Sequence, residues 1–77
     1  MDTTTHFDDM LVERSISRDW VDRTVSDPDR IEDRSEGNRH YLKQIPEFGN
    51  RWLRVVVDIT SEPPCAITVF FDRRIER

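Results

Sequence analysis

Apolar and polar residues alternate most regularly in the segment Arg51 to Thr60, which is rich in β-branched residues and holds no glycine or proline. This pattern is typical of a β-strand. At a period of two, Leu53, Val55, Val57 and Ile59 lie on one apolar face, and Trp52, Arg54, Val56 and Asp58 lie on a mixed face. The apolar face has to be covered, so we expect helices to pack on it and to leave the mixed face open.

Two amphipathic segments precede this strand and predict helices over residues 6–14 and 18–26. We expect Thr5 to cap the first helix and Ser17 to cap the second, because their hydroxyl oxygens can accept from N–H groups of the first turn. The expected inward stripes are Phe7, Met10 and Leu11 in the first helix and Trp20, Val21, Thr24 and Val25 in the second. Pro28 ends the second helix, since the residue before a proline avoids the helical conformation.

After Pro28 the period changes to that of strands, which we expect over residues 30–35, 39–45, 51–60 and 66–73. In the last strand Ile67, Val69 and Phe71 are expected to face the core. Short connections favour antiparallel neighbours. The sequence therefore predicts a single α+β domain over residues 1–77, with two N-terminal helices packed on one face of a four-stranded antiparallel sheet.

Composition limits the kinds of site and the cellular compartment that we expect for this domain. A single cysteine, Cys65, excludes an internal disulfide and a cysteine-built zinc site, and we expect it to be an inert thiol. No apolar run approaches the roughly 20 residues of a membrane-spanning helix, and the N-terminus does not resemble a signal peptide. We therefore expect a cytoplasmic protein without a membrane partner.

The net charge of −4 is unevenly distributed, with −6 over residues 1–36 and +2 over residues 37–77. A polyanion would meet the sheet half, and a basic partner would meet the helical half. For the acidic half, ordinary solubility charge is the alternative.

The chain holds no metal motif, because His6 and His40 have no partner at ligand spacing, and no glycine-rich phosphate loop, because it has only two glycines. We expect no cofactor. What remains is a group of cations and titratable side chains, Arg39, Tyr41, Lys43 and Arg54, with His40 as a further member. On adjacent strands Arg39, Tyr41, Lys43 and Arg54 can share the face away from the helices.

This inventory, with His6 and Arg73 added, suits metal-independent cleavage of RNA. The 2′-hydroxyl needs a base, the phosphorane needs fixed positive charge and the 5′-oxygen needs a proton donor. Each residue also has a plainer interpretation. The cations can form a solvated face, Tyr41 can be a packing residue, His6 a surface residue, and Trp52 a side chain that closes the end of the sheet.

Short motifs in a fixed order carry a family resemblance. They are His6 with Met10, Glu13-Arg14-Ser15-Ile16-Ser17, Trp20-Val21, Asp27-Pro28-Asp29-Arg30, Arg39-His40-Tyr41-Leu42-Lys43, Leu53-Arg54-Val55-Val56-Val57 and Thr68-Val69-Phe70-Phe71-Asp72. In these motifs, from His6 to Asp72, the chain resembles a domain-of-unknown-function family of small bacterial proteins. That family is similar to the RelE/ParE-like and BrnT-like toxins, and more broadly to barnase-type ribonucleases.

The resemblance implies an RNase-like toxin domain with a RelE/barnase-like fold. It aligns His6, Arg14, Arg39, Tyr41, Lys43 and Arg54 with recurrent polar positions of the family. We therefore expect His6 or Tyr41 to transfer protons, Lys43 and Arg54 to stabilise charge, and Arg14, Arg39, Arg73 and Trp52 to bind the substrate.

Two functions follow as hypotheses. The first is a small metal-independent endoribonuclease, the toxin of a bacterial toxin–antitoxin pair, with RNA as substrate and a small antitoxin as partner. The second is a non-catalytic immunity, antitoxin or regulatory module that binds a protein through its acidic helices. No oligomeric state follows from the sequence.

Overall fold

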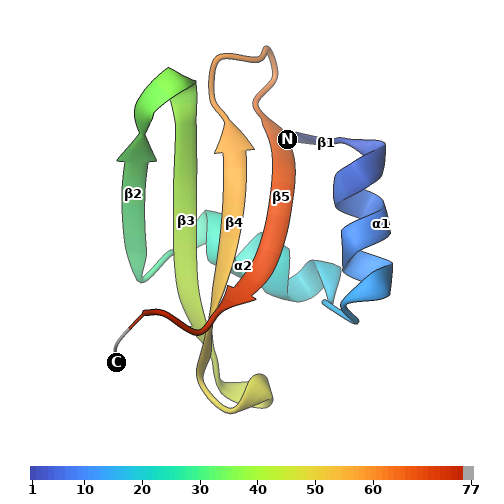
Figure 1. Ribbon diagram of the computed structural model, residues 1–77, viewed down its shortest axis with the longest axis vertical. Coiled ribbons are helices and arrows are strands. Elements are labelled where there is room, and N and C mark those ends of the chain that lie inside the picture. Colours follow the sequence, from blue (N-terminus) through green and yellow to red (C-terminus); the bar gives the residue numbers. More distant parts are fainter. Residues whose placement is uncertain (76–77) are drawn as a thin grey trace.

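Two helices and five strands form the part of the chain that the computed structural model describes, which is residues 1–75 without the side chain of Ser35 (Figure 1). The strands are β1 (Asp2–Thr3), β2 (Arg30–Arg34), β3 (Asn38–Ile45), β4 (Arg51–Asp58) and β5 (Cys65–Asp72), and the helices are α1 (Thr5–Glu13) and α2 (Arg18–Ser26). Two 3-10 turns, η1 (Ser35–Gly37) and η2 (Pro46–Phe48), join β2 to β3 and β3 to β4.

The sheet has the order β1-β5-β4-β3-β2, and β2 to β5 form an antiparallel meander. The α+β class with two helices is confirmed, but the expected four-stranded antiparallel sheet is wrong. A fifth strand, β1, pairs parallel with β5, where Asp2 lies opposite Cys65 and Thr3 opposite Ala66. A strand of two residues is too short to show the alternation of apolar and polar residues, so no sequence pattern indicated it.

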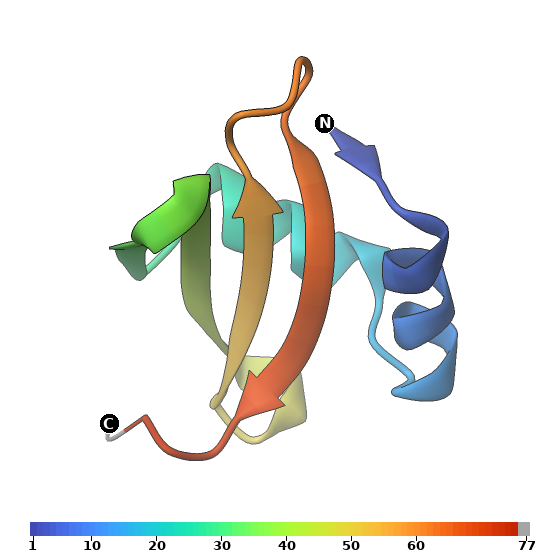
Figure 2. The same cartoon turned by 45° about the horizontal axis from the view of Figure 1, so that its top comes forward.

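Both helices contribute to one core on one side of the sheet. Helix α2 runs across the back of β3 and β4, while α1 packs against β5 (Figures 1 and 2). The expected helix stripes meet the apolar face of β4, where Leu53, Val55 and Val57 are fully or almost fully buried. Ile59 does not join them, because β4 ends at Asp58 and leaves Ile59 38% exposed. Neither helix in the described part is long and apolar enough to span a membrane.

The sheet face away from the helices, which we call the open face, is covered by side chains of its own strands. Leu42, Trp52 and Val56 are buried there. The guanidinium of Arg30 lies 5.3 Å from the centre of the Trp52 ring. Long charged side chains can shield apolar surface with their methylene stems, which explains how a face without a helix buries three apolar residues.

Helix α1 begins one residue earlier than expected. Thr4, in extended conformation, is the N-cap, and its hydroxyl oxygen accepts from the Phe7 N–H at 3.0 Å. Thr5 is therefore the first helical residue, and the cap assigned to it from the sequence is wrong. Ser17 caps α2 as expected, since its hydroxyl oxygen accepts from the Asp19 N–H at 3.1 Å.

A β-bulge changes which residues of β5 face the core. Val56 pairs with Thr68, but Val57 pairs with Ala66, so Ile67 is an extra residue in β5. Ala66 takes the fully buried position, and Ile67 is only half-buried. The expectation that Ile67 faces the core is therefore wrong, because strict alternation does not survive a bulge.

Candidate functional site

The register between β3 and β4 separates the side chains that the sequence placed on one face. Lys43 pairs with Leu53, and Tyr41 pairs with Val55, so both lie on the side covered by the helices. Arg54 pairs with Leu42 and lies on the open face. Directly opposite residues of an antiparallel pair share a face. The expectation that Arg39, Tyr41, Lys43 and Arg54 share the open face is therefore wrong.

Local contacts hold these side chains at positions away from Arg54. The Lys43 Nζ donates to the Asp27 carbonyl at 2.8 Å, at the end of α2, and its side chain is only 17% exposed. Arg39 donates to the Asp33 carboxylate at 2.6 Å, and Tyr41 packs against the core. His6 is exposed in the first turn of α1. The structure does not bring these residues together with Arg54, and their individual roles stay predictions.

Arg54 instead lies at the centre of a polar cluster on the open face. Its Nε donates to Asp72 Oδ2 at 2.9 Å, and its Nη1 lies 3.2 Å from Glu32 Oε1 and 2.7 Å from His40 Nδ1. These residues, Glu32, His40, Arg54 and Asp72, come from four adjacent strands, β2 to β5. We call them the Arg54 network.

Arg54 also determines the chemical state of His40. A guanidinium has no acceptor, so Nδ1 of His40 must accept the hydrogen bond, and the proton of the neutral ring lies on Nε2. Burial lowers the pKa of His40 below 6.5, and the positive charges of Arg54 and Arg34 lower it further. The imidazole is therefore neutral near pH 7.

The carboxylates of the network are held ionised. Burial raises the pKa of Asp72, but hydrogen bonds from Arg74 and Arg54 outweigh it and bring the pKa to about 2. For Glu32, burial likewise opposes ionisation, yet hydrogen bonds from Arg54 and Arg34 leave its pKa below the usual value. Both groups are proton acceptors at neutral pH.

The accessible part of the network is the pair Glu32 and His40. They lie directly opposite each other on β2 and β3 and are both half-buried, whereas the side chain of Arg54 is only 7% exposed. Two exposed cations, Arg30 and Arg34, flank Glu32 on the same face of β2 and pair with its carboxylate at 3.7 Å and 2.6 Å. The arrangement offers a carboxylate, an imidazole and guanidinium groups within reach of one bound phosphate.

Sequence reasoning missed Glu32 and Asp72 and gave His40 only a secondary place. Asp72 was visible on the face of the last strand away from the core, together with Thr68 and Phe70, but a charge at a strand end carries no signal by itself. Only the register places Glu32 beside His40 and brings both to Arg54. The pairing of the strands is a feature of the tertiary structure, so the sequence pattern did not show that these residues meet.

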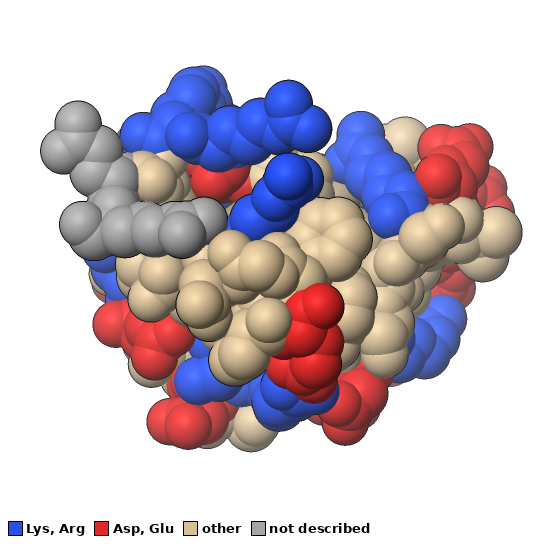
Figure 3. All heavy atoms as spheres, turned by 90° about the horizontal axis from the view of Figure 1, so that it is seen from below, with Lys and Arg blue, Asp and Glu red and all other residues tan. Residues whose placement is uncertain are grey.

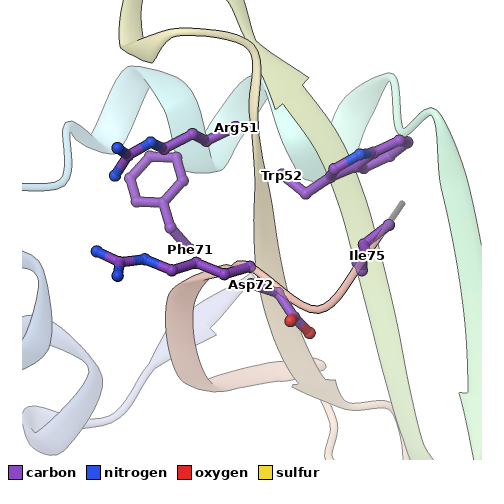
Figure 4. Close-up of a pocket in the computed structure, with 6 residues that line it drawn as sticks. Arg51, Trp52, Phe71, Asp72 and Ile75 are labelled. Carbon is purple, nitrogen blue, oxygen red and sulfur yellow. The ribbon is translucent and has the colours of Figure 1, made fainter. Parts of the chain in front are cut away.

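Some of the expected binding residues do converge, at the end of the sheet where β4 begins and β5 ends. Arg14 and Arg73 line one hollow there together with Arg51, which the sequence did not single out, and we call this surface of three arginines the arginine end. Trp52 lines the adjoining hollow, of about 320 Å³. Figure 4 shows this hollow, with Arg51 beside the Phe71 ring. Of the residues expected to bind substrate, only Arg39 lies elsewhere, in its ion pair on the helix-covered side.

A protein-family model described as "Domain of unknown function (DUF4258)" matches residues 3–71 of the chain. The matched segment contains both helices, strands β2 to β4 and nearly all of β5. No curated protein and no solved structure matches the chain. Within residues 1–75, no group of three or more His, Cys, Asp or Glu side chains is arranged to hold a metal ion.

Proposed function

The chain belongs to the DUF4258 family, and we propose that it is a small endoribonuclease that cleaves RNA without a metal, as the toxin of a bacterial toxin–antitoxin pair. One observation carries the proposal. A carboxylate, an imidazole and a guanidinium are in direct contact on the open face of the sheet, in Glu32, His40 and Arg54. Metal-independent cleavage of RNA uses these three chemical groups.

The carboxylate of Glu32 accepts the proton of the 2′-hydroxyl in this proposal. The 2′-oxygen then forms a bond to phosphorus while the bond from phosphorus to the 5′-oxygen breaks. His40 in its protonated form donates a proton to the leaving 5′-oxygen, and the products are a 2′,3′-cyclic phosphate and a 5′-hydroxyl. Arg30 and Arg34 bind the phosphate oxygens, since a guanidinium can donate two parallel hydrogen bonds to phosphate.

Substrate binding supplies the protonated state of His40. A bound phosphate offsets the positive charges of Arg34 and Arg54, which raises the pKa of the ring. Protonation of Nδ1 also requires Arg54 to move away from it, and the phosphate offers Arg54 a new acceptor. The rate of cleavage should therefore show a bell-shaped dependence on pH. It should fall in acid because Glu32 becomes protonated, and fall in alkali because His40 loses its proton.

The test is incubation of the purified protein with total RNA and with a labelled single-stranded RNA, each with and without EDTA. We expect cleavage in both conditions, and a loss of about 100-fold or more in Glu32→Gln and His40→Asn. Arg18→Ala, in an exposed ion pair on the helical side, is the matched control and should cleave normally. Absence of cleavage by the wild type, or normal cleavage by His40→Asn, would contradict the proposal.

The same assay tests the roles predicted from the sequence for His6, Tyr41 and Lys43. Their separation from the Arg54 network leads us to expect smaller losses than for His40→Asn. A loss in Tyr41→Phe as large as in His40→Asn would move the reacting centre to the other side of the sheet.

A protein-binding module is the second candidate, and one observation favours it. Asp9, Glu13 and Asp22 are exposed on the two helices and form no ion pair with any described residue, whereas Asp8 and Asp19 pair with Arg18 and Arg23. A basic protein partner, such as an antitoxin, fits this surface. Pull-down from native cells should then yield a salt-sensitive complex that weakens in Asp9→Asn/Asp22→Asn and not in Asp8→Asn/Asp19→Asn.

A further inference from the structure

The lysine and arginine side chains of this protein fall into two groups, those that form an ion pair with a carboxylate and those that do not. Most of the described lysines and arginines have a carboxylate within 4.0 Å: Arg18, Arg23, Arg30, Arg34, Arg39, Lys43, Arg54 and Arg74. Within residues 1–75, only Arg14, Arg51 and Arg73 form no ion pair. All three are exposed and line the same hollow.

These three arginines reach the arginine end from distant parts of the chain. Arg14 is the C-cap of α1, Arg51 is the first residue of β4, and Arg73 directly follows β5. Figure 3 looks onto this end of the molecule, where lysine and arginine side chains border the upper side of an uncharged surface and carboxylates border its lower side. A positive patch assembled from three separate elements does not follow from local charge runs in the sequence.

The carboxylates at this end do not cancel the patch. Glu47 forms an ion pair with Arg23, and Asp72 forms ion pairs with Arg54 and Arg74. Hydrogen bonds from Arg23 bring the pKa of Glu47 to about 2, which shows how fully that carboxylate is engaged. The local field at the arginine end is therefore positive although the whole chain carries a net charge of −4.

Aromatic rings form the floor of the patch. Phe48 and Phe71 are stacked with their ring centres 4.5 Å apart, and Phe48 is 39% exposed. The guanidinium of Arg51 lies 5.2 Å from the centre of the Phe48 ring. Arg14 is held in place by donating to the Val69 carbonyl at 2.7 Å. Planar guanidinium groups and aromatic rings are the surfaces on which proteins stack unpaired bases.

We propose that the arginine end binds single-stranded nucleic acid, with backbone phosphates on Arg14, Arg51 and Arg73 and one unpaired base stacked on the Arg51 guanidinium, which the Phe48 ring supports. The hollow that these residues line has a volume of about 250 Å³, and Arg51 and Arg73 also line the adjoining hollow of about 320 Å³. A duplex keeps its bases stacked inside and offers no base to the Arg51 guanidinium. This inference concerns binding alone, so it stands whether or not the Arg54 network cleaves RNA.

Asp72 connects the two surfaces. It belongs to the Arg54 network and also lines the hollow beside Arg73. The arginine end and the open face therefore adjoin at the end of β5.

Fluorescence anisotropy with a labelled 12-nucleotide strand tests the proposal. The protein carries His40→Asn, so that cleavage does not remove the ligand, and the ligands are single-stranded RNA, single-stranded DNA and the matching duplex. We expect at least one single strand to bind about tenfold more tightly than the duplex. Arg51→Ala and Arg73→Ala should each weaken binding about fivefold or more and lower the salt dependence by about one phosphate contact. Arg18→Ala, which removes a paired arginine, is the matched control.

Inorganic polyphosphate, which has charge but no bases, separates stacking from simple attraction. We expect it to compete poorly, and Phe48→Leu to weaken the binding of the single strand but not of polyphosphate. The proposal is overturned if no single strand binds, if Arg51→Ala behaves like Arg18→Ala, or if polyphosphate binds as tightly as the strand. Circular dichroism of each variant excludes loss of folding. Binding by a wild type that does not cleave would support this inference and reject the proposed ribonuclease activity.

Discussion

The Nη1 of Arg54 lies 2.7 Å from Nδ1 of His40, and this contact fixes the proton of the neutral imidazole on Nε2. Because the donor is a permanent cation, the contact also disfavours the protonated ring. The two residues sit on adjacent strands, β3 and β4, but the contact is diagonal, since His40 pairs with Val56 and Arg54 pairs with Leu42. The chemistry of the open face depends on this diagonal contact.

The first prediction concerns the titration of His40. Burial and the charges of Arg54 and Arg34 should place its pKa below 6.5 in the folded protein. Arg34→Ala removes one of these charges at an exposed position, so the pKa of His40 should rise. Carbon–proton NMR of the imidazole measures both values, and His40→Asn assigns the signal. A pKa above 6.5 in the wild type, or no response to Arg34→Ala, would contradict the arrangement.

The sequence was most informative where its hydrophobic period was strong. Phe7, Met10 and Leu11 recur at helical spacing, and Leu53 and Val55 recur at strand spacing, so the α+β class and the helix-covered face of β4 could be derived. Burial of an apolar stripe decides these elements without help from the rest of the chain.

Strand β3 lacks such a contrast. Arg39, Tyr41 and Lys43 alternate with His40, Leu42 and Gln44, and neither set is clearly apolar. Which set faces the helices depends on the register with β4, and a shift by one residue would exchange the two faces. The expectation that Arg39, Tyr41 and Lys43 share a face with Arg54 was therefore wrong, although the strand itself was found.

The arginine end was foreseen only in part. Arg14, Arg73 and Trp52 were expected to bind substrate, but Arg51 was not singled out. A sequence shows where charges are, and it does not show which of them are neutralised in the fold. The absence of an ion pair distinguishes Arg51 from a paired residue such as Arg39, and it depends on tertiary contacts.

The second prediction concerns stability in acid. The folded pKa of Asp72 is about 2 against an ordinary 3.8, so the unfolded chain takes up a proton first as the pH falls. The stabilisation is complete above pH 3.8 and is lost as the pH falls toward 2. Urea unfolding between pH 5 and 2 should show this slope, and Asp72→Asn should reduce it to the part that other carboxylates with a lowered pKa, such as Glu47, contribute. An equal slope in both proteins would show that Asp72 is not the responsible carboxylate.

The third prediction concerns the buried ion pairs of Arg54. Arg54→Met leaves the buried Asp72 carboxylate with only the exposed Arg74 as its cationic partner, and it also removes the pair with Glu32, so it should cost about 3 kcal/mol of unfolding free energy. Arg18→Met breaks an exposed pair and should cost about 1 kcal/mol or less. The double variant Arg54→Met/Asp72→Leu should cost less than the sum of its single changes, because neither charge is left alone. Additive costs in denaturant melts would contradict this coupling.

The fourth prediction separates two neighbouring threonines at the start of α1. Thr4→Ala removes the hydroxyl that accepts from Phe7 N–H and should cost about 1 kcal/mol. Thr5→Ala, at the first helical position, should change stability by about 0.5 kcal/mol or less. Thermal unfolding of the two variants measures the difference. A larger cost for Thr5→Ala would restore the cap assignment made from the sequence.

The fifth prediction uses the two glycines as a matched pair. Both have positive φ, +77° at Gly37 and +67° at Gly49, so an alanine at either position is strained by about 1–2 kcal/mol. At Gly37 an added Cβ would also lie 2.3 Å from Thr60 Cγ2, whereas at Gly49 it would meet nothing within 4 Å. Gly37→Ala should therefore destabilise the protein more than Gly49→Ala, as measured by urea unfolding.

Thr60→Ser tests the cause of that difference, because it deletes Cγ2 and keeps the hydroxyl that donates to Asp58 at 2.6 Å. Placed in the Gly37→Ala background, it should recover the extra cost and leave only the backbone strain that Gly49→Ala also shows. If the two alanine variants lose the same free energy, or if Thr60→Ser recovers nothing, the turn between β2 and β3 does not pack against Thr60 as the structure has it.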